Sequence, residues 1–130
     1  MEQKTVLYIE DNFHNRRIVR KILQSRGYSL VEAEDGISGL AMVQELKPPL
    51  VLLDIGLPGM DGLEVVGRIK ADEELQKIPV IALTASAMRG DRERFLAAGC
   101  DDYLSKPVQA MELIDMVANH YPSSNGKGRP

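Results

Sequence analysis

The fold of this chain is decided by the stretch LVLLDIGLPGMDG, residues 50–62. It begins as an unbroken apolar run, and a run this short is typical of a strand buried on both faces of a sheet. Asp54 stands where that strand ends, and Gly56, Pro58 and Gly59 then predict a sharp turn. Open parallel sheets bind ligands at the carboxyl ends of their strands, which makes Asp54 a candidate functional residue. Taken alone, it could equally be a turn former or a helix N-cap.

Outward from this stretch, short apolar segments alternate with stretches that have helical spacing. The predicted strands are 6–9, 28–31, 50–53, 79–83 and 103–105. Each is followed by a predicted helix, and strict alternation of this kind favours a parallel sheet with right-handed crossovers and helices on both faces. We therefore predict an α/β domain of the doubly wound (βα)5 type, with the folded domain in residues 1–121 and a disordered tail in residues 122–130.

The first predicted helix has two different faces. It is opened by Asn12 and Asn15 and closed by Gly27 as a C-terminal cap. Its inward stripe is predicted to be Ile18, Val19, Ile22 and Leu23. Its outer face is predicted to carry Arg16, Arg17, Arg20 and Lys21. That face is either a solvated surface or a docking surface for an acidic or phosphorylated partner.

Composition limits the possible classes of protein. The 130 residues are 44% hydrophobic, which fits one globular domain with an ordinary core. No apolar run reaches the ~20 residues that a membrane span needs, and the first strand follows the N-terminus too closely for a signal peptide. The single cysteine, Cys100, indicates a reducing compartment, so we expect a cytoplasmic protein. The net charge of −3 argues against a nucleic-acid partner.

Four of the predicted strands end in polar side chains that would share one edge of the sheet. Glu10 and Asp11 follow the first strand, Asp54 and Thr84 end the third and fourth, and Lys106 follows the fifth. Clustered carboxylates repel one another unless a cation compensates, and hard oxygen ligands suit Mg²⁺. A phosphoryl group on Asp54 would then be held by the metal, the Lys106 ammonium and the Thr84 hydroxyl. Singly, these residues could be helix caps, an ordinary strand end and a surface lysine.

With these residues at the strand ends, the chain resembles the receiver domains of bacterial two-component response regulators. The resemblance extends from about residue 5 to about residue 121. The matching motifs are Glu10-Asp11-Asn12, Asp54 within residues 53–62, Thr84-Ala85, and Tyr103 ahead of Lys106-Pro107. The chain is similar to single-domain regulators of the chemotaxis and cell-division type. The resemblance implies a flavodoxin-like sheet of five parallel strands in the order 2-1-3-4-5.

The resemblance also implies a role for each acid. Asp54 would accept a phosphoryl group from a histidine kinase or a histidine phosphotransfer protein. Glu10, Asp11 and Asp54, with the backbone carbonyl of Gly56, would hold Mg²⁺ or Mn²⁺. The protein would be a signalling switch and not an enzyme acting on other substrates.

Three further residues would transmit the phosphorylation signal. Thr84 would turn toward the phosphoryl group, Tyr103 would turn inward, and Lys106 would contact the phosphate. The Lys106–Pro107 peptide bond would be cis. A downstream protein would bind the face formed by the helix of residues 88–98, the Tyr103 strand and the last helix.

Gly56 and Ser86 occupy positions that vary in the family and bear on how long the phosphate lasts. Gly56 has no side chain with which to orient a hydrolytic water, and Ser86 is short. We therefore predict slow self-dephosphorylation, over minutes or longer, because water positioning drives such hydrolysis.

Three other interpretations of the site remain open. The chain could be the receiver of a hybrid histidine kinase. An aspartate-nucleophile phosphatase would commonly place a second acid two residues after the nucleophile, and Gly56 stands there instead. A flavin or nucleotide site would need a glycine-rich phosphate loop after the first strand, where Glu10 and Asp11 stand.

Overall fold

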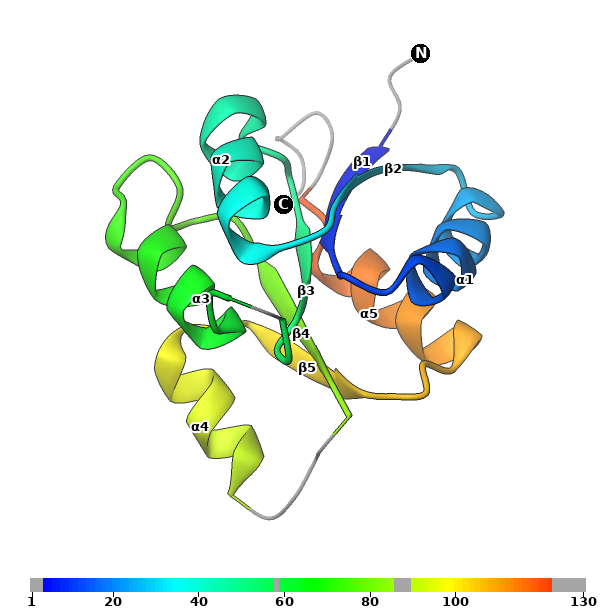
Figure 1. The fold of residues 1–130 in the computed structure, drawn as a ribbon. Coiled ribbons are helices and arrows are strands. Elements are labelled where there is room, and N and C mark those ends of the chain that lie inside the picture. Colours follow the sequence, from blue (N-terminus) through cyan, green and yellow to red (C-terminus); the bar gives the residue numbers. More distant parts are fainter. Residues whose placement is uncertain (1–3, 58, 86–89, 123–130) are drawn as a thin grey trace.

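The computed structural model describes residues 4–57, 59–85 and 90–122 (Figure 1). Its strands are β1 (Lys4–Ile9), β2 (Tyr28–Ala33), β3 (Val51–Asp54), β4 (Val80–Thr84) and β5 (Asp102–Ser105). They form one five-stranded sheet in the order β2-β1-β3-β4-β5, and every neighbouring pair is parallel. The predicted fold class and strand order are therefore confirmed.

Five helices connect the strands and cover both faces of the sheet. They are α1 (Phe13–Gln24), α2 (Gly36–Leu46), α3 (Gly62–Ala71), α4 (Asp91–Ala98) and α5 (Ala110–His120). Helices α1 and α5 cover one face, and α2, α3 and α4 cover the other (Figure 1). Among the described residues, none of these helices is both long enough and apolar enough to span a membrane.

The central strands are apolar throughout because both of their faces are covered. In β1, Leu7 packs with the α2–α4 side of the core, whereas Val6 packs with the α1 and α5 side. In β3, Leu53 packs with the α2–α4 side of the core and Leu52 packs with the α1 and α5 side. Successive side chains of a strand point to opposite faces, so a strand covered on both faces needs apolar residues at every position.

The first three helices begin at the edge where the strands end. Asn12, Asp35 and Asp61 are the N-caps of α1, α2 and α3, and each side chain accepts a backbone N–H of the helix that follows. At Asp35, hydrogen bonds from the backbone and side chain of Ser38 lower the pKa of the carboxyl group. Capping fixes the point where each loop gives way to helix, and so fixes the loops around the candidate site.

The first helix differs in part from its prediction. Val19 and Leu23 are buried as expected, but Ile18 is 42% exposed. Arg16, which was predicted on the outer face of the helix, is buried. The helix ends at Gln24 with Ser25 as its C-cap, so the prediction of Gly27 as the cap was wrong; Gly27 adopts a positive φ of 90° in the following turn.

Other strand and helix boundaries also differ from their predicted positions. Strand β1 begins at Lys4 and β2 extends to Ala33, because the ladder between these two strands runs over six residue pairs. Helix α4 begins at Asp91. Residues 86–89, which include Ser86 and the predicted start of this helix, lie outside the described residues, as do residues 123–130 of the predicted tail.

Gly62 allows α3 to begin directly against the end of β3. A Cβ atom at Gly62 would lie 2.7 Å from the Cα atom of Ile55 and 2.9 Å from the carbonyl oxygen of Asp54. Both neighbours are backbone atoms, so they could yield only if the end of β3 moved. The close approach therefore holds Asp54 in place through its own main chain.

We predict that Gly62→Ala lowers the free energy of unfolding by about 2 kcal/mol, because an added methyl group overpacks this contact. Gly67→Ala is the matched control in the same helix, since no neighbouring atom in the described part of the chain lies within 4 Å of a Cβ atom there. The control should raise stability by up to about 1 kcal/mol through helix propensity. Urea denaturation followed by circular dichroism measures both, and equal effects of the two substitutions would contradict the prediction.

Candidate functional site

Three carboxylates gather at the carboxyl edge of the sheet. Glu10 and Asp11 directly follow β1, and Asp54 is the last residue of β3. One oxygen from each lies within 4.8 Å of the others. Glu10 is 1% exposed and Asp54 is 6% exposed, whereas Asp11 reaches solvent. The adjacency of β1 and β3 in the sheet brings these acids together from positions more than forty residues apart.

The Lys106 ammonium group lies between two of these acids. Its Nζ atom is 3.0 Å from Oε1 of Glu10 and 3.2 Å from Oδ1 of Asp54. Burial disfavours the charged form of Lys106, but the hydrogen bond to Glu10 and the charges of Asp54 and Glu10 outweigh it and raise the pKa of Lys106. The backbone N–H of Lys106 donates to the carbonyl of Thr84, and the Lys106–Pro107 peptide bond is cis.

Glu10 is held by donors from three other residues. The Tyr8 hydroxyl donates to its Oε1 at 3.1 Å, and the Asn12 backbone N–H donates to its Oε2 at 3.2 Å. The Arg16 guanidinium donates to its backbone carbonyl at 2.8 Å. Burial raises the pKa of Tyr8, and the charge of Glu10 adds to the effect, so the phenol stays a donor. A buried carboxylate requires such partners.

Sequence reasoning missed Tyr8 as a part of this site. It was counted only as one member of an apolar strand. The available signal was its position two residues before Glu10, since residues two apart in a strand lie on the same face. Tyr is also a residue whose hydroxyl finds a partner when buried, and the nearest polar group on that face is the Glu10 carboxylate.

Arg16 was predicted to lie on the exposed outer face of α1, either solvated or in a docking surface, and this placement was wrong because Arg16 is buried. Its Nε atom lies 3.3 Å from Oε1 of Glu32 on β2, and Arg20 contacts the other oxygen of Glu32 at the same distance. Besides these ion pairs, Arg16 donates to the Glu10 carbonyl. The spacing of apolar residues in α1 placed Arg16 on the outer face of the helix. In the structure, Glu32 on β2 gives Arg16 a partner beside the site.

Asp54 and Gly56 form a short turn at the end of β3. The Gly56 backbone N–H donates to Oδ1 of Asp54 at 3.1 Å. Among the described residues, this oxygen is the only atom within 4 Å of a Cβ atom built at Gly56, at 3.9 Å. The absence of a side chain at position 56 therefore leaves open space beside the Asp54 carboxylate.

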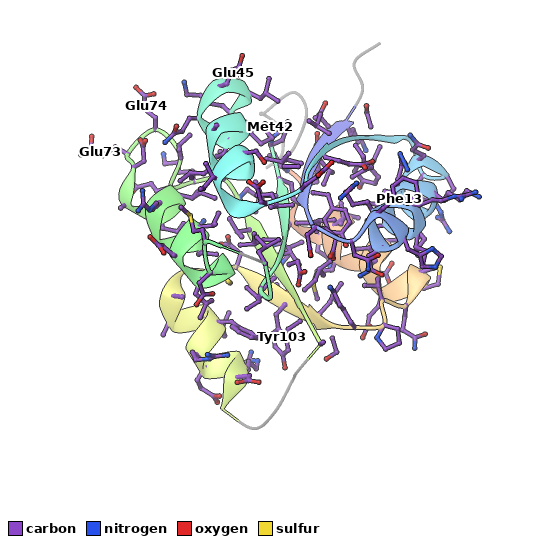
Figure 2. All side chains as sticks on the ribbon, viewed as in Figure 1. Phe13, Met42, Glu45, Glu73, Glu74 and Tyr103 are labelled. Atoms are coloured by element: carbon purple, nitrogen blue, oxygen red, sulfur yellow. The ribbon has the colours of Figure 1, made fainter. Side chains whose placement is uncertain are left out.

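Thr84 and Tyr103 lie beyond the acid cluster on the next two strands. Thr84 ends β4, is buried, and pairs in register with Ser105 of β5. Tyr103 is half-buried on β5, and its ring centroid lies 5.8 Å from that of Phe95 in α4. Figure 2 shows Tyr103 beside α4. Thr84 thus lies between the acids and the strand that carries Tyr103, and Ser86 is outside the described residues.

The chemistry of this edge suits a hard divalent cation. Glu10, Asp11 and Asp54 offer only carboxylate oxygens, and Asp11 lies on the solvent side. Mg²⁺ prefers oxygen ligands and keeps several bound waters. A cluster that is open to solvent on one side therefore suits Mg²⁺, whereas a structural zinc site is closed. The acidic cluster could therefore hold a magnesium ion.

Comparison with known proteins identifies the family. A family model described as the response regulator receiver domain matches residues 6–118. The chain belongs to the response regulator receiver domain family. It is accordingly a receiver domain of two-component signalling, the family whose motifs the sequence resembled.

Curated relatives of this receiver domain include two polar-differentiation response regulators. The polar-differentiation response regulator DivK of Brucella anthropi is 40% identical over 117 residues, which are 90% of this chain and 95% of that protein. DivK of Brucella ovis is 41% identical with the same coverage.

Solved structures of similar receivers share the fold. The receiver domain of the sensor histidine kinase PA1611 of Pseudomonas aeruginosa, solved with a magnesium ion in its active-site cleft, is 35% identical. It matches 92% of this chain and 98% of that chain with a TM-score of 0.84. The chemotaxis protein CheY4 of Vibrio cholerae is 25% identical, with a TM-score of 0.85 over 92% of this chain and 99% of that chain.

We predict that Arg16→Met lowers the free energy of unfolding by about 2 kcal/mol, because it removes the donor to the Glu10 carbonyl and one partner of Glu32. Arg17→Met, at an exposed position of the same helix, should change it by no more than about 0.5 kcal/mol. Urea denaturation measures both variants. A loss of the same size in the two would mean that the buried contacts of Arg16 contribute nothing.

Proposed function

We propose that this receiver domain is a switch controlled by Mg²⁺-dependent phosphorylation of Asp54. The observation that carries the proposal is the Lys106 ammonium group within 3.2 Å of both Glu10 and Asp54. A bound magnesium ion would be held by Glu10, Asp11 and Asp54, with the Gly56 carbonyl, and would neutralise charge on the transferring phosphoryl oxygens.

The chain's own groups divide the work of phosphoryl transfer. An oxygen of Asp54 forms the new P–O bond while the P–N bond of a donor phosphohistidine breaks, and the electron pair leaves with the imidazole, which takes up a proton. Since Oδ1 of Asp54 is engaged by Gly56 and Lys106, we assign Oδ2 as the attacking oxygen. Lys106 then contacts a phosphoryl oxygen, where a fixed positive charge stabilises the product.

The phosphodonor in this proposal is a histidine kinase or a histidine phosphotransfer protein. It would dock beside the acid cluster on α1, which exposes Arg17 and Lys21 together with apolar Ile18 and Phe13. Phe13 is 63% exposed at the start of α1 (Figure 2). Positive charge around an apolar surface favours an acidic partner with apolar contacts of its own.

The output side of the proposed switch consists of Thr84, Tyr103 and the surface of α4, β5 and α5. The Thr84 hydroxyl would bond to the phosphoryl group, and the resulting movement would change the packing of Tyr103 against Phe95. A downstream protein would bind that surface differently in the two states. The 40% identity over most of DivK supports a regulator of this kind.

A receiver belonging to a hybrid histidine kinase is the second candidate, favoured by the 35% identity to the PA1611 receiver. An aspartate-nucleophile phosphatase is disfavoured, because Gly56 provides no second acid beside Asp54. We propose residues 1–121 as the receiver domain, and the cytoplasm as its compartment because the lone cysteine fits a reducing environment.

We predict that acetyl phosphate with Mg²⁺ transfers one phosphoryl group to the protein, and that Asp54→Asn abolishes the transfer. Asp61→Asn is the matched control: an exposed aspartate whose capping of α3 asparagine can also provide. Intact-protein mass spectrometry measures the label, and hydroxylamine should remove it because it is an acyl phosphate. Labelling that persists in Asp54→Asn or with EDTA would contradict the proposal.

The wild-type label should decay over minutes or longer, and a lifetime of seconds would contradict the role given to Gly56.

We predict that Thr84→Val still accepts the label but no longer transmits it. In the wild-type protein, phosphorylation should change amide hydrogen exchange in β5 and α4, and this change should fall at least severalfold when the hydroxyl is removed. Ser105→Ala is the control, since Ser105 is the exposed register partner of Thr84. Hydrogen exchange measured by mass spectrometry decides the question. A full response in Thr84→Val would show that its hydroxyl does not carry the signal.

A further inference from the structure

Tyr8 lies on the buried side of the site, and the proposed mechanism does not use it. It is 1% exposed and packs in the core between the sheet and helices α1 and α5. Its hydroxyl nevertheless points at the carboxylate of Glu10 and donates to Oε1 at 3.1 Å. A phenol placed within a core so that it reaches a carboxylate calls for a physical explanation beyond packing.

Oε1 of Glu10 accepts from two donors in the described structure, the Tyr8 hydroxyl and the Lys106 ammonium. The Lys106 ammonium also contacts Oδ1 of Asp54 at 3.2 Å. Lys106 is therefore the donor that can leave Glu10 when a phosphoryl group is added to Asp54. If it moves to a phosphoryl group on Asp54, Tyr8 alone among the described side chains still donates to Oε1. Glu10 is 1% exposed, so water is a poor substitute for a lost donor.

The two oxygens of Glu10 thereby have different surroundings. Oε1 faces the Tyr8 hydroxyl, while Oε2 accepts the Asn12 backbone N–H at the start of α1. A hydrogen bond from a rigid, buried donor fixes the rotation of the carboxylate, because the Tyr8 ring is enclosed by the core. Fixing Oε1 also fixes the direction in which Oε2 points.

We propose that Tyr8 is a positioning residue, whose hydroxyl holds the Glu10 carboxylate in its cation-binding orientation while Lys106 moves to the phosphoryl group. The movement of Lys106 rests on the proposed function; the hold on Glu10 does not. Tyr8 contacts neither the phosphoryl group nor the metal, and acts only through Glu10.

This role makes the effect of Tyr8 depend on the state of the site. In the unmodified protein Lys106 also donates to Oε1, so loss of the Tyr8 hydroxyl is partly compensated. With a phosphoryl group or its mimic on Asp54, Lys106 is engaged elsewhere and the loss is complete. A purely structural role in the core would affect both states by the same factor.

The test compares Tyr8→Phe with Tyr121→Phe. Tyr121 donates its hydroxyl to the Thr5 carbonyl at 3.2 Å, so the control also removes a tyrosine hydrogen bond but lies away from the acids. Mg²⁺ affinity is measured by titration of the metal-free protein, and affinity for beryllofluoride, a phosphoryl mimic, is measured at saturating Mg²⁺. Tyr8→Phe should weaken Mg²⁺ binding about threefold and beryllofluoride binding about tenfold or more, and Tyr121→Phe should change neither by more than about twofold.

A third readout needs neither metal nor phosphoryl chemistry. The carbon-13 chemical shift of the Glu10 carboxylate should change in metal-free Tyr8→Phe and stay constant in Tyr121→Phe. Unchanged Mg²⁺ and beryllofluoride binding in Tyr8→Phe would overturn the proposal. So would an equal loss of affinity for Mg²⁺ and for beryllofluoride, or an unchanged chemical shift of the Glu10 carboxylate. Failure of the wild-type protein to accept a label on Asp54 would instead overturn the proposed function, while the Glu10 shift would still test the hold of Tyr8 on Glu10.

Discussion

The rest of the structure depends on one electrostatic arrangement, a single ammonium group shared by two nearly buried carboxylates. Glu10 and Asp54 are almost removed from water, which would be unfavourable for two ionised acids without a nearby cation. Lys106 lies within 3.2 Å of both, and the hydrogen bond to Glu10 together with the charges of Asp54 and Glu10 raises its pKa despite burial. One ammonium does not balance three acids, so the site has the negative charge to attract a further cation.

The parallel sheet makes this arrangement possible. Each strand delivers its last residue to the same edge, and the order β2-β1-β3-β4-β5 places the strands that carry Glu10 and Asp54 side by side at its centre. Side-chain caps then start three helices at that edge, and Gly62 lets α3 approach the backbone of Asp54 closely. The site is therefore built on rigid strand ends, with loops only at its rim.

Around the acids, a second group of side chains holds the first group in place. Arg16 joins the Glu10 backbone to Glu32 of β2, and Tyr8 joins the Glu10 side chain to the core below. Both contacts converge on one acid, which suggests why Glu10 can be the most deeply buried of the three. Asp11, by contrast, faces solvent, on the side from which a hydrated ion would enter.

The sequence by itself determined the alternation of strands and helices, and with it the edge to which Glu10, Asp54, Thr84 and Lys106 belong. Runs of apolar residues and turn residues are local signals, so a linear pattern is enough to assign them. Resemblance to a family supplied the strand order, which the structure confirms, and the role that is proposed for each acid.

Only the tertiary structure decided which partners those residues meet. Arg16 looked like an ordinary charge on an outer helix face, and Tyr8 looked like one more core residue, because periodicity assigns a face but does not say what lies opposite it. Their contacts depend on the neighbouring β2 strand and on the exact rotation of α1, which the packing of the whole domain sets. Hydrogen bonds and ion pairs act over a few ångströms, and such distances are fixed by packing, not by spacing along the chain.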